Sequence, residues 1–85
     1  MSEDSAYKRL CWHSRRGMLE LDLMLGPFVK ERYLELSVLD QNRYRDLLVC
    51  EDQDLFRWLL GLEQADNAEI AAIVEKIIQY ARART

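Results

Sequence analysis

The sequence predicts an all-α fold, a compact bundle of about five short helices. Apolar residues recur at helical spacing over most of the 85 residues, whereas alternation with a period of two never extends beyond a few positions. Hairpin dipeptides such as Asn-Gly are absent. A chain of this length supports one hydrophobic core, so we expect a single domain over residues 1–85 without a deeply enclosed pocket.

Two helical runs are expected before residue 37. In the first, Tyr7, Leu10 and Cys11 stand at helical spacing. In the second, one arc of the helical wheel collects four apolar residues that should face the core: Met18, Leu21, Leu25 and Phe28. Gly26-Pro27 should divide this run, because glycine suits the end of one helix and proline the first turn of the next.

The middle of the chain predicts two shorter helices. Ser37, with Asp40 three residues later, is typical of a helix start. The helix that follows would carry Tyr44, Leu47 and Leu48. The next helix has an apolar stripe made of Leu55, Trp58, Leu59 and Leu62. We expect Asp52 or Asp54 to cap its start and Gly61 to end it.

The last helix is expected over about residues 67–84. Its apolar residues form the most regular stripe in the chain: Ile70, Ile73, Val74, Ile77, Ile78 and Ala81. Asp66 with Glu69 suits a capping box at its start. Lys76, Arg82 and Arg84 suit the negative end of its dipole.

The charge pattern excludes several classes of protein. The formal net charge is -3, and residues 46–69 hold seven acids against Arg57, so nucleic acid is not an expected partner. The longest uncharged stretch, residues 23–29, is far too short to insert into a membrane. The acidic N-terminus lacks the pattern of a signal peptide. We therefore expect a cytoplasmic monomer.

The cysteines and the single histidine do not predict a metal centre. Cys11, Cys50 and His13 lack the paired spacings of zinc ligands. Cys11 and His13, two residues apart, would point to different sides of a helix. Two reduced, structural thiols are the favoured interpretation, and a metal or Cys/His catalytic site is the alternative. His13 is expected on the surface or facing a partner.

One segment, Arg16-Gly17-Met18-Leu19-Glu20, departs from the local helix rules. Gly17 stands near the start of an apolar helical run, where it costs about 0.5–1 kcal/mol relative to alanine. A helical wheel places Arg16 and Glu20 together on the face opposite the core, beside Leu19 and Leu23.

Three interpretations of this mixed face follow. It is a surface ion pair of structural value only, a docking surface for a polypeptide, or the site of a catalytic Glu20. The catalytic interpretation is the weakest, because no second titratable group or nucleophile accompanies Glu20. Glycine-rich phosphate-binding loops are absent.

The same segment resembles the R-G-x-x-E motif of the succinate dehydrogenase flavinylation factors (the SdhE family, also called succinate dehydrogenase assembly factor 2). The resemblance extends over the surrounding run from Trp12 to Asp22 and continues in Pro27-Phe28, Tyr33, Leu36-Ser37 and Leu47-Leu48. A second signature follows at residues 52–59, where Gln53 replaces the proline that family members often carry. Together these motifs span about residues 7–60 in the family's order and spacing.

The resemblance implies a five-helix assembly factor and not an enzyme. Such factors bind the flavoprotein subunit of succinate dehydrogenase, and in bacteria also that of fumarate reductase, and promote covalent attachment of FAD to a histidine of that subunit. Arg16, Gly17 and Glu20 carry over as the partner-binding residues, and Arg15, Asp22 and His13 extend the contact. No FAD is expected to stay bound to the factor itself, which would act on the FAD of its partner.

Three points stay open in the sequence. Trp12, Phe56 and Trp58 are either core residues, the favoured interpretation, or flavin-stacking residues. One alternative function is an antitoxin-like role, with a small membrane protein as the partner. The other is a generic adaptor that binds a different partner through the same face.

Overall fold

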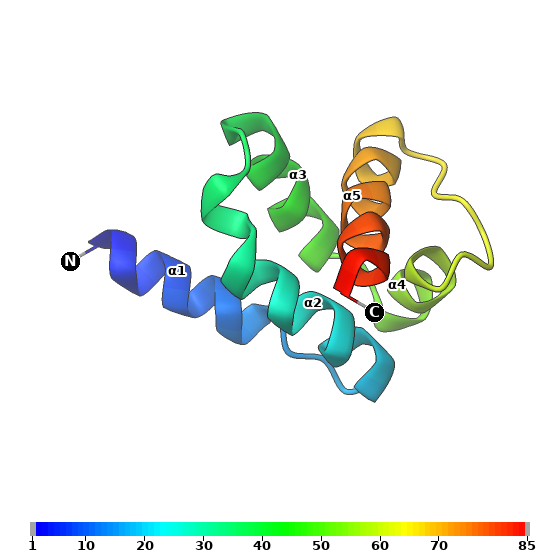
Figure 1. Cartoon of the computed structure of the whole chain (residues 1–85), viewed down its shortest axis with the longest axis horizontal. Coiled ribbons are helices and arrows are strands. Elements are labelled where there is room, and N and C mark those ends of the chain that lie inside the picture. Colours follow the sequence, from blue (N-terminus) through cyan, green and yellow to red (C-terminus); the bar gives the residue numbers. More distant parts are fainter. Residues whose placement is uncertain (1, 85) are drawn as a thin grey trace.

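The computed structural model describes the backbone of residues 2–84 and the side chains of residues 5–84. This part of the chain forms five α-helices and one short 3-10 helix and has no strand, which confirms the predicted all-α fold. The helices, labelled in Figure 1, are α1 (Ser2–His13), α2 (Leu19–Glu31), α3 (Val38–Leu48), α4 (Asp52–Leu59) and α5 (Ala68–Arg84). The 3-10 helix, η1 (Tyr33–Glu35), follows α2 directly.

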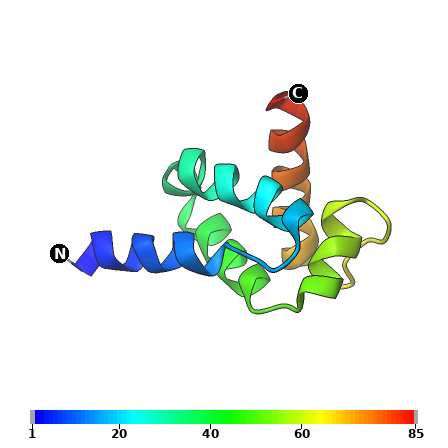
Figure 2. The same ribbon diagram turned by 90° about the horizontal axis from the view of Figure 1, so that it is seen from below.

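Helix α5 packs against α2, α3 and α4, and the core lies between these four helices. Helix α1 packs on α2 and extends away from the rest of the molecule (Figure 2). The most deeply buried apolar side chains are Leu21, Leu25, Phe28, Val29, Tyr44, Leu47, Leu55, Ile73 and Ile77. Their large combined apolar area is the main source of stability in a domain of this size.

The core agrees with the predicted apolar stripes, with a few exceptions. Met18 is half-buried against the core instead of within it, and Leu62 is exposed because α4 has ended before it. Tyr80, which belongs to none of the predicted stripes, is buried, and its ring packs edge-on against Phe28.

Two of the predicted helix boundaries are confirmed by their hydrogen bonds and backbone angles. The Ser37 side chain caps α3 and accepts the Asp40 N–H at 3.1 Å. Gly61 follows the end of α4 with φ of 75°, a left-handed conformation that glycine adopts without strain.

The predicted caps of the last two helices are wrong. Helix α4 begins at Asp52 itself, so Asp52 and Asp54 lie inside its first turn, and Glu51 at the cap position makes no side-chain cap bond. For α5 the cap is Asn67 and not Asp66: the Asn67 Oδ1 accepts the N–H groups of Glu69 and Ile70 at 2.8 and 3.1 Å. The cap therefore lies one residue later than the sequence pattern indicates.

The expected break at Gly26-Pro27 is also wrong, because α2 continues through both residues to Glu31. Pro27 removes one backbone hydrogen bond, which costs about 3 kcal/mol in a helix interior. Leu21 and Leu25 before the proline and Phe28 after it are all buried in the same core. Burial of about 1.5–3 kcal/mol per side chain on both sides of Pro27 offsets that cost.

Candidate protein-binding face

The segment between α1 and α2 is fastened to the core at Ser14, directly after α1. The Ser14 hydroxyl donates to the Leu10 carbonyl at 2.9 Å and lies 2.6 Å from the hydroxyl of Tyr44 on α3. Both side chains are fully buried. Burial raises the pKa of Tyr44, so the phenol stays neutral and keeps its hydrogen bond with Ser14. The start of the loop is therefore fixed.

Arg16 provides a second attachment, this time to the junction of α3 and α4. Its guanidinium donates to the carbonyl of Leu48, the last residue of α3, and forms an ion pair with Asp52 at 3.4 Å. An arginine there satisfies one of the unpaired carbonyls at a helix C-terminus and favours the helix dipole. The buried Arg16 Nε has no hydrogen-bond partner. The contacts of the Arg16 guanidinium therefore stabilise the folded chain itself.

The predicted pairing of Arg16 with Glu20 on one helical face is wrong. Helix α2 begins at Leu19, so Arg16 precedes it and the four-residue spacing of a helix does not apply. Asp22 is likewise tied to the loop: its Oδ1 accepts the Arg16 backbone N–H at 2.6 Å. Two contacts thus position the loop: the Arg16 guanidinium binds the Leu48 carbonyl, and the Asp22 carboxylate binds the Arg16 backbone N–H.

Other residues of this segment are exposed, and we refer to them together as the 12–23 face. Its members are Trp12, His13, Arg15, Gly17, Leu19, Glu20 and Leu23. The two leucines are 68% and 63% exposed, as predicted. The Glu20 side chain makes no hydrogen bond or ion pair with any described residue. This face joins an unpaired carboxylate to exposed apolar side chains, as protein interfaces do.

The predicted core position of Trp12 is wrong. We expected a core side chain, but Trp12 is 70% exposed, and the Arg15 guanidinium lies 5.7 Å from the centre of its ring. Phe56 and Trp58, by contrast, pack against the core as expected. An exposed tryptophan beside an arginine is a combination enriched in the energetic centres of protein interfaces.

Gly17 has no steric role inside the folded chain. Its φ lies outside the left-handed range, and a Cβ built on it would come no closer than 3.9 Å to another side chain, the Asp52 carboxylate. That distance is an ordinary van der Waals contact. The fold therefore does not require glycine here, and the absent side chain leaves backbone accessible on the 12–23 face.

The thiols lie apart from this chemistry. Cys11 and Cys50 are free, half-buried and packed against the core, as structural thiols would be. Burial raises the pKa of the Cys50 thiol, which lowers its reactivity. Among the side chains of residues 5–84 the structure brings together no group of three His, Cys, Asp or Glu suited to a metal ion. None of the described helices is long and apolar enough to cross a membrane.

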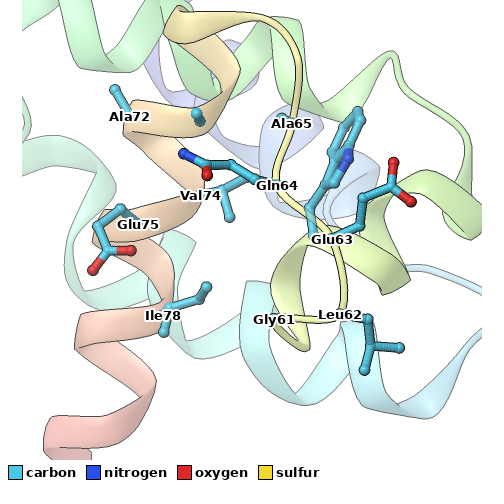
Figure 3. A pocket seen from close by; sticks show the side chains of 11 residues that line it. Gly61, Leu62, Glu63, Gln64, Ala65, Ala72, Val74, Glu75 and Ile78 are labelled. Carbon is cyan, nitrogen blue, oxygen red and sulfur yellow. The ribbon is translucent and has the colours of Figure 1, made fainter.

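A separate groove of about 620 Å³ lies between α5 and the loop that follows α4. Figure 3 shows Gln64 reaching from this loop toward Val74 of α5, while the Glu75 side chain points away from the loop. The carboxylate of Glu63 on this loop pairs with Arg57 at 3.3 Å. The groove combines small apolar residues with a few polar groups and does not touch the 12–23 face.

The fold and the site define a small all-α protein with an exposed mixed face on a firmly held loop. Residues 8–81 match the family described as "Flavinator of succinate dehydrogenase". The chain is 50% identical over 78 residues to the FAD assembly factor SdhE of Pseudomonas savastanoi pv. phaseolicola, covering 92% of this chain and 93% of that protein. It is 49% identical to the FAD assembly factor SdhE of Pseudomonas aeruginosa, with the same coverage.

A solved structure also matches this chain in fold and sequence. The solution structure of a UPF0350 protein, 36% identical, superimposes with a TM-score of 0.74 and covers 99% of this chain and 87% of that one. The chain belongs to the family of succinate dehydrogenase flavinators.

Proposed function

We propose that this protein binds the flavoprotein subunit of succinate dehydrogenase through its 12–23 face and promotes covalent attachment of FAD to a histidine of that subunit. The flavoprotein of fumarate reductase is a second partner of the same kind. The protein works as a cytoplasmic monomer, has no active site of its own and holds no FAD stably. Family membership supports the class of function, and the geometry of the face supports the residues.

One observation carries the assignment of the face. Gly17 meets no steric constraint and the Glu20 side chain has no hydrogen-bond or ion-pair partner among the described residues, yet the loop that bears Gly17 is fixed by the buried contact of Ser14 and the half-buried contact of Arg16. A rigid support beneath an unsatisfied carboxylate lowers the entropy cost of docking. Such a face is suited to a partner polypeptide.

The residues of the motif divide into contact and positioning roles. Glu20 offers an acceptor to the partner, and Gly17 allows its backbone to approach closely. Arg15 and His13 extend this contact from the end of α1. Arg16 and Asp22 hold the loop in position instead of meeting the partner with their full hydrogen-bonding capacity.

The mechanism is conformational. Docking of the 12–23 face holds the flavoprotein in a shape that keeps its histidine and FAD in reactive geometry, which lowers the entropic part of the barrier. The flavin supplies the covalent chemistry. A protein that acts this way needs a shaped surface and no pocket of its own.

Covalent flavin on the dehydrogenase tests the proposal. In a strain that lacks the gene, we expect Glu20→Ala and Gly17→Arg to leave flavin fluorescence of the denatured flavoprotein near the level of the deletion strain. Glu75→Ala, at an exposed acid on α5, should restore it fully, and Gly17→Ala, which adds only one methyl group, should restore more of it than Gly17→Arg. All four proteins should retain their helical circular dichroism.

Two results would contradict the proposal. One is normal covalent flavin with both Glu20→Ala and Gly17→Arg, which would remove these residues from the function. The other is a pull-down in which the wild-type protein captures a small membrane protein and no flavoprotein. That result would favour the antitoxin-like interpretation.

A further inference from the structure

A second groove, of about 700 Å³, runs between α1 and α2, and we call it the α1–α2 groove. The two helices lie side by side in opposite directions (Figures 1 and 2), and the Tyr7 hydroxyl on α1 donates to the Val29 carbonyl on α2 at 3.1 Å. Cys11, Pro27 and Val29 give the groove apolar lining. Trp12 and Arg15 border it at one end, so the groove is continuous with the 12–23 face.

The charges along this groove are mostly positive, and they are unpaired among the side chains of residues 5–84. Lys8, Arg15, Lys30 and Arg84 all line it, and none of the four forms an ion pair with a described residue. Arg15 and Arg84 instead lie over the rings of Trp12 and Tyr80. A run of unpaired cations is unexpected in a chain whose net charge is -3.

The two carboxylates of the groove, Asp22 and Glu31, each accept a hydrogen bond from a neutral donor of the fold. Asp22 accepts the Arg16 N–H at 2.6 Å, and Glu31 accepts the Tyr80 hydroxyl. Both keep their negative charge, so four cations against two carboxylates leave the groove with a formal charge of +2. The groove therefore offers a positive potential over an apolar floor to whatever covers it.

The dimensions of the groove favour an extended ligand. Asp22 and Glu31 mark its two ends on α2, nine residues apart, which is about 14 Å along a helix. An extended peptide of about four residues covers that length. A single phosphate would not: Lys8 and Lys30 lie near the end where Tyr7 contacts α2, whereas Arg15 borders the groove at the Trp12 end.

We propose that the α1–α2 groove binds an acidic segment of the flavoprotein, with carboxylates at Lys8 and Lys30 near one end and at Arg15 near the other, and with an apolar side chain on the floor between these ends. This inference rests on the proposed function, because it takes the flavoprotein as the partner. It adds the chemistry of a second contact. The groove steers and fixes the partner beside the 12–23 face, which keeps its separate role.

Carbodiimide cross-linking tests the contact directly, because this reagent joins only amines and carboxylates that already touch. In the complex of the wild-type protein with its cognate flavoprotein subunit, we expect mass spectrometry to find Lys8 or Lys30 linked to Asp or Glu of the flavoprotein. Lys76 is the internal control: its Nζ lies 3.0 Å from Asp40, so it should form a link within the chain.

Binding measurements give the second arm. Lys8→Gln/Lys30→Gln should bind the flavoprotein about 5–10-fold more weakly at about 50 mM NaCl, and the difference should fall below about 2-fold at about 500 mM, where salt screens exposed charges. The control, Lys76→Gln/Arg82→Gln, removes the same charge from α5 outside the groove and should bind like the wild type.

The outcomes separate this inference from the proposed function. The groove is not a binding site for the flavoprotein if Lys8→Gln/Lys30→Gln binds like the wild type and only the Lys76–Asp40 link forms in the complex. That result would leave the proposed function intact. A wild-type protein that does not bind the flavoprotein at all would overturn both. Saturable binding of sodium pyrophosphate that the double variant loses, without cross-links to the flavoprotein, would show a phosphate site and also overturn the inference.

Discussion

Replacing Arg16 by alanine tests the division of the motif into positioning and contact residues. The substitution removes the guanidinium that joins the Leu48 carbonyl to the Asp52 carboxylate. We expect it to lower the free energy of unfolding, whereas Glu20→Ala should leave it within about 0.5 kcal/mol, as is usual for an exposed side chain without partners.

The size of the loss follows from the surroundings of the guanidinium. A hydrogen bond from a charged donor contributes about 1.5–3 kcal/mol. The two side chains of the ion pair with Asp52 are 16% and 32% exposed, so solvent still reaches the pair. We assign it about 0.2–1 kcal/mol, the value of an exposed ion pair. Removing the buried, unpartnered Nε returns part of that sum. The net loss is about 2 kcal/mol, or a melting temperature lower by about 8–16 °C for a domain of this size.

Circular dichroism at a helical wavelength, followed during urea and thermal unfolding, measures the effect. Arg16→Lys should fall between Arg16→Ala and the wild type, because a lysine keeps the charge but not the planar fork that reaches both acceptors. Equal stabilities of Arg16→Ala and Glu20→Ala would refute the reasoning. It would also be refuted by an Arg16→Ala protein that melts within about 2 °C of the wild type.

The remaining predictions concern the core, a helix cap and pH. Ile77→Ala should destabilise the protein by about 2–4 kcal/mol in urea unfolding, because this side chain is fully buried on α5. Asn67→Ala should cost about 1 kcal/mol, since it leaves two N–H groups at the start of α5 without their acceptor. The hydrogen bond from Lys76 lowers the pKa of Asp40, with Arg43 contributing. The unfolded chain therefore takes up a proton at Asp40 at higher pH than the fold does, and stability from this group should be lost as the pH falls below about 4.

Matched variants control these measurements. Val49→Ala changes an exposed apolar residue and should move the stability by less than about 0.5 kcal/mol, so an equal effect of Ile77→Ala would contradict its buried position. Asp66→Ala should leave α5 intact. If it lowers the free energy of unfolding more than Asn67→Ala does, Asp66 and not Asn67 is the cap of α5. In the pH series, Asp40→Asn should reduce the loss of unfolding free energy below about pH 4. An unchanged pH dependence would exclude Asp40 as the source of that loss.

Local signals predicted most of the helices, because their causes lie within one or two turns of the chain. The stripe from Ile70 to Ala81 defined α5 to within a residue or so, and the Ser37 cap and the end of α4 at Gly61 were both correct. Each of these depends on side-chain spacing or on backbone freedom at one position. The exposure of Leu19 and Leu23 followed from the same spacing.

Contacts between distant residues could not be predicted in this way. Ser14 and Tyr44 are 30 positions apart, and Arg16 and Asp52 are 36 apart. No periodicity links such pairs, so the wheel assigned Arg16 to a helix that begins after it. The exposure of Trp12 was missed for a related reason: apolar character alone favours burial, and only the packing of α1 on α2 decides which side of α1 is covered.

The proline inside α2 has a consequence for the face beside it. Pro27 has no N–H, so the carbonyl of Leu23, one turn earlier, lacks the donor that a continuous helix would give it. That oxygen belongs to Leu23, an exposed residue of the 12–23 face, and a buried carbonyl without a donor costs free energy. A partner that covers Leu23 with apolar groups alone would strand this acceptor at a cost of about 1–3 kcal/mol. The helix thus discriminates among partners by favouring one that brings a hydrogen-bond donor to a single point on its backbone.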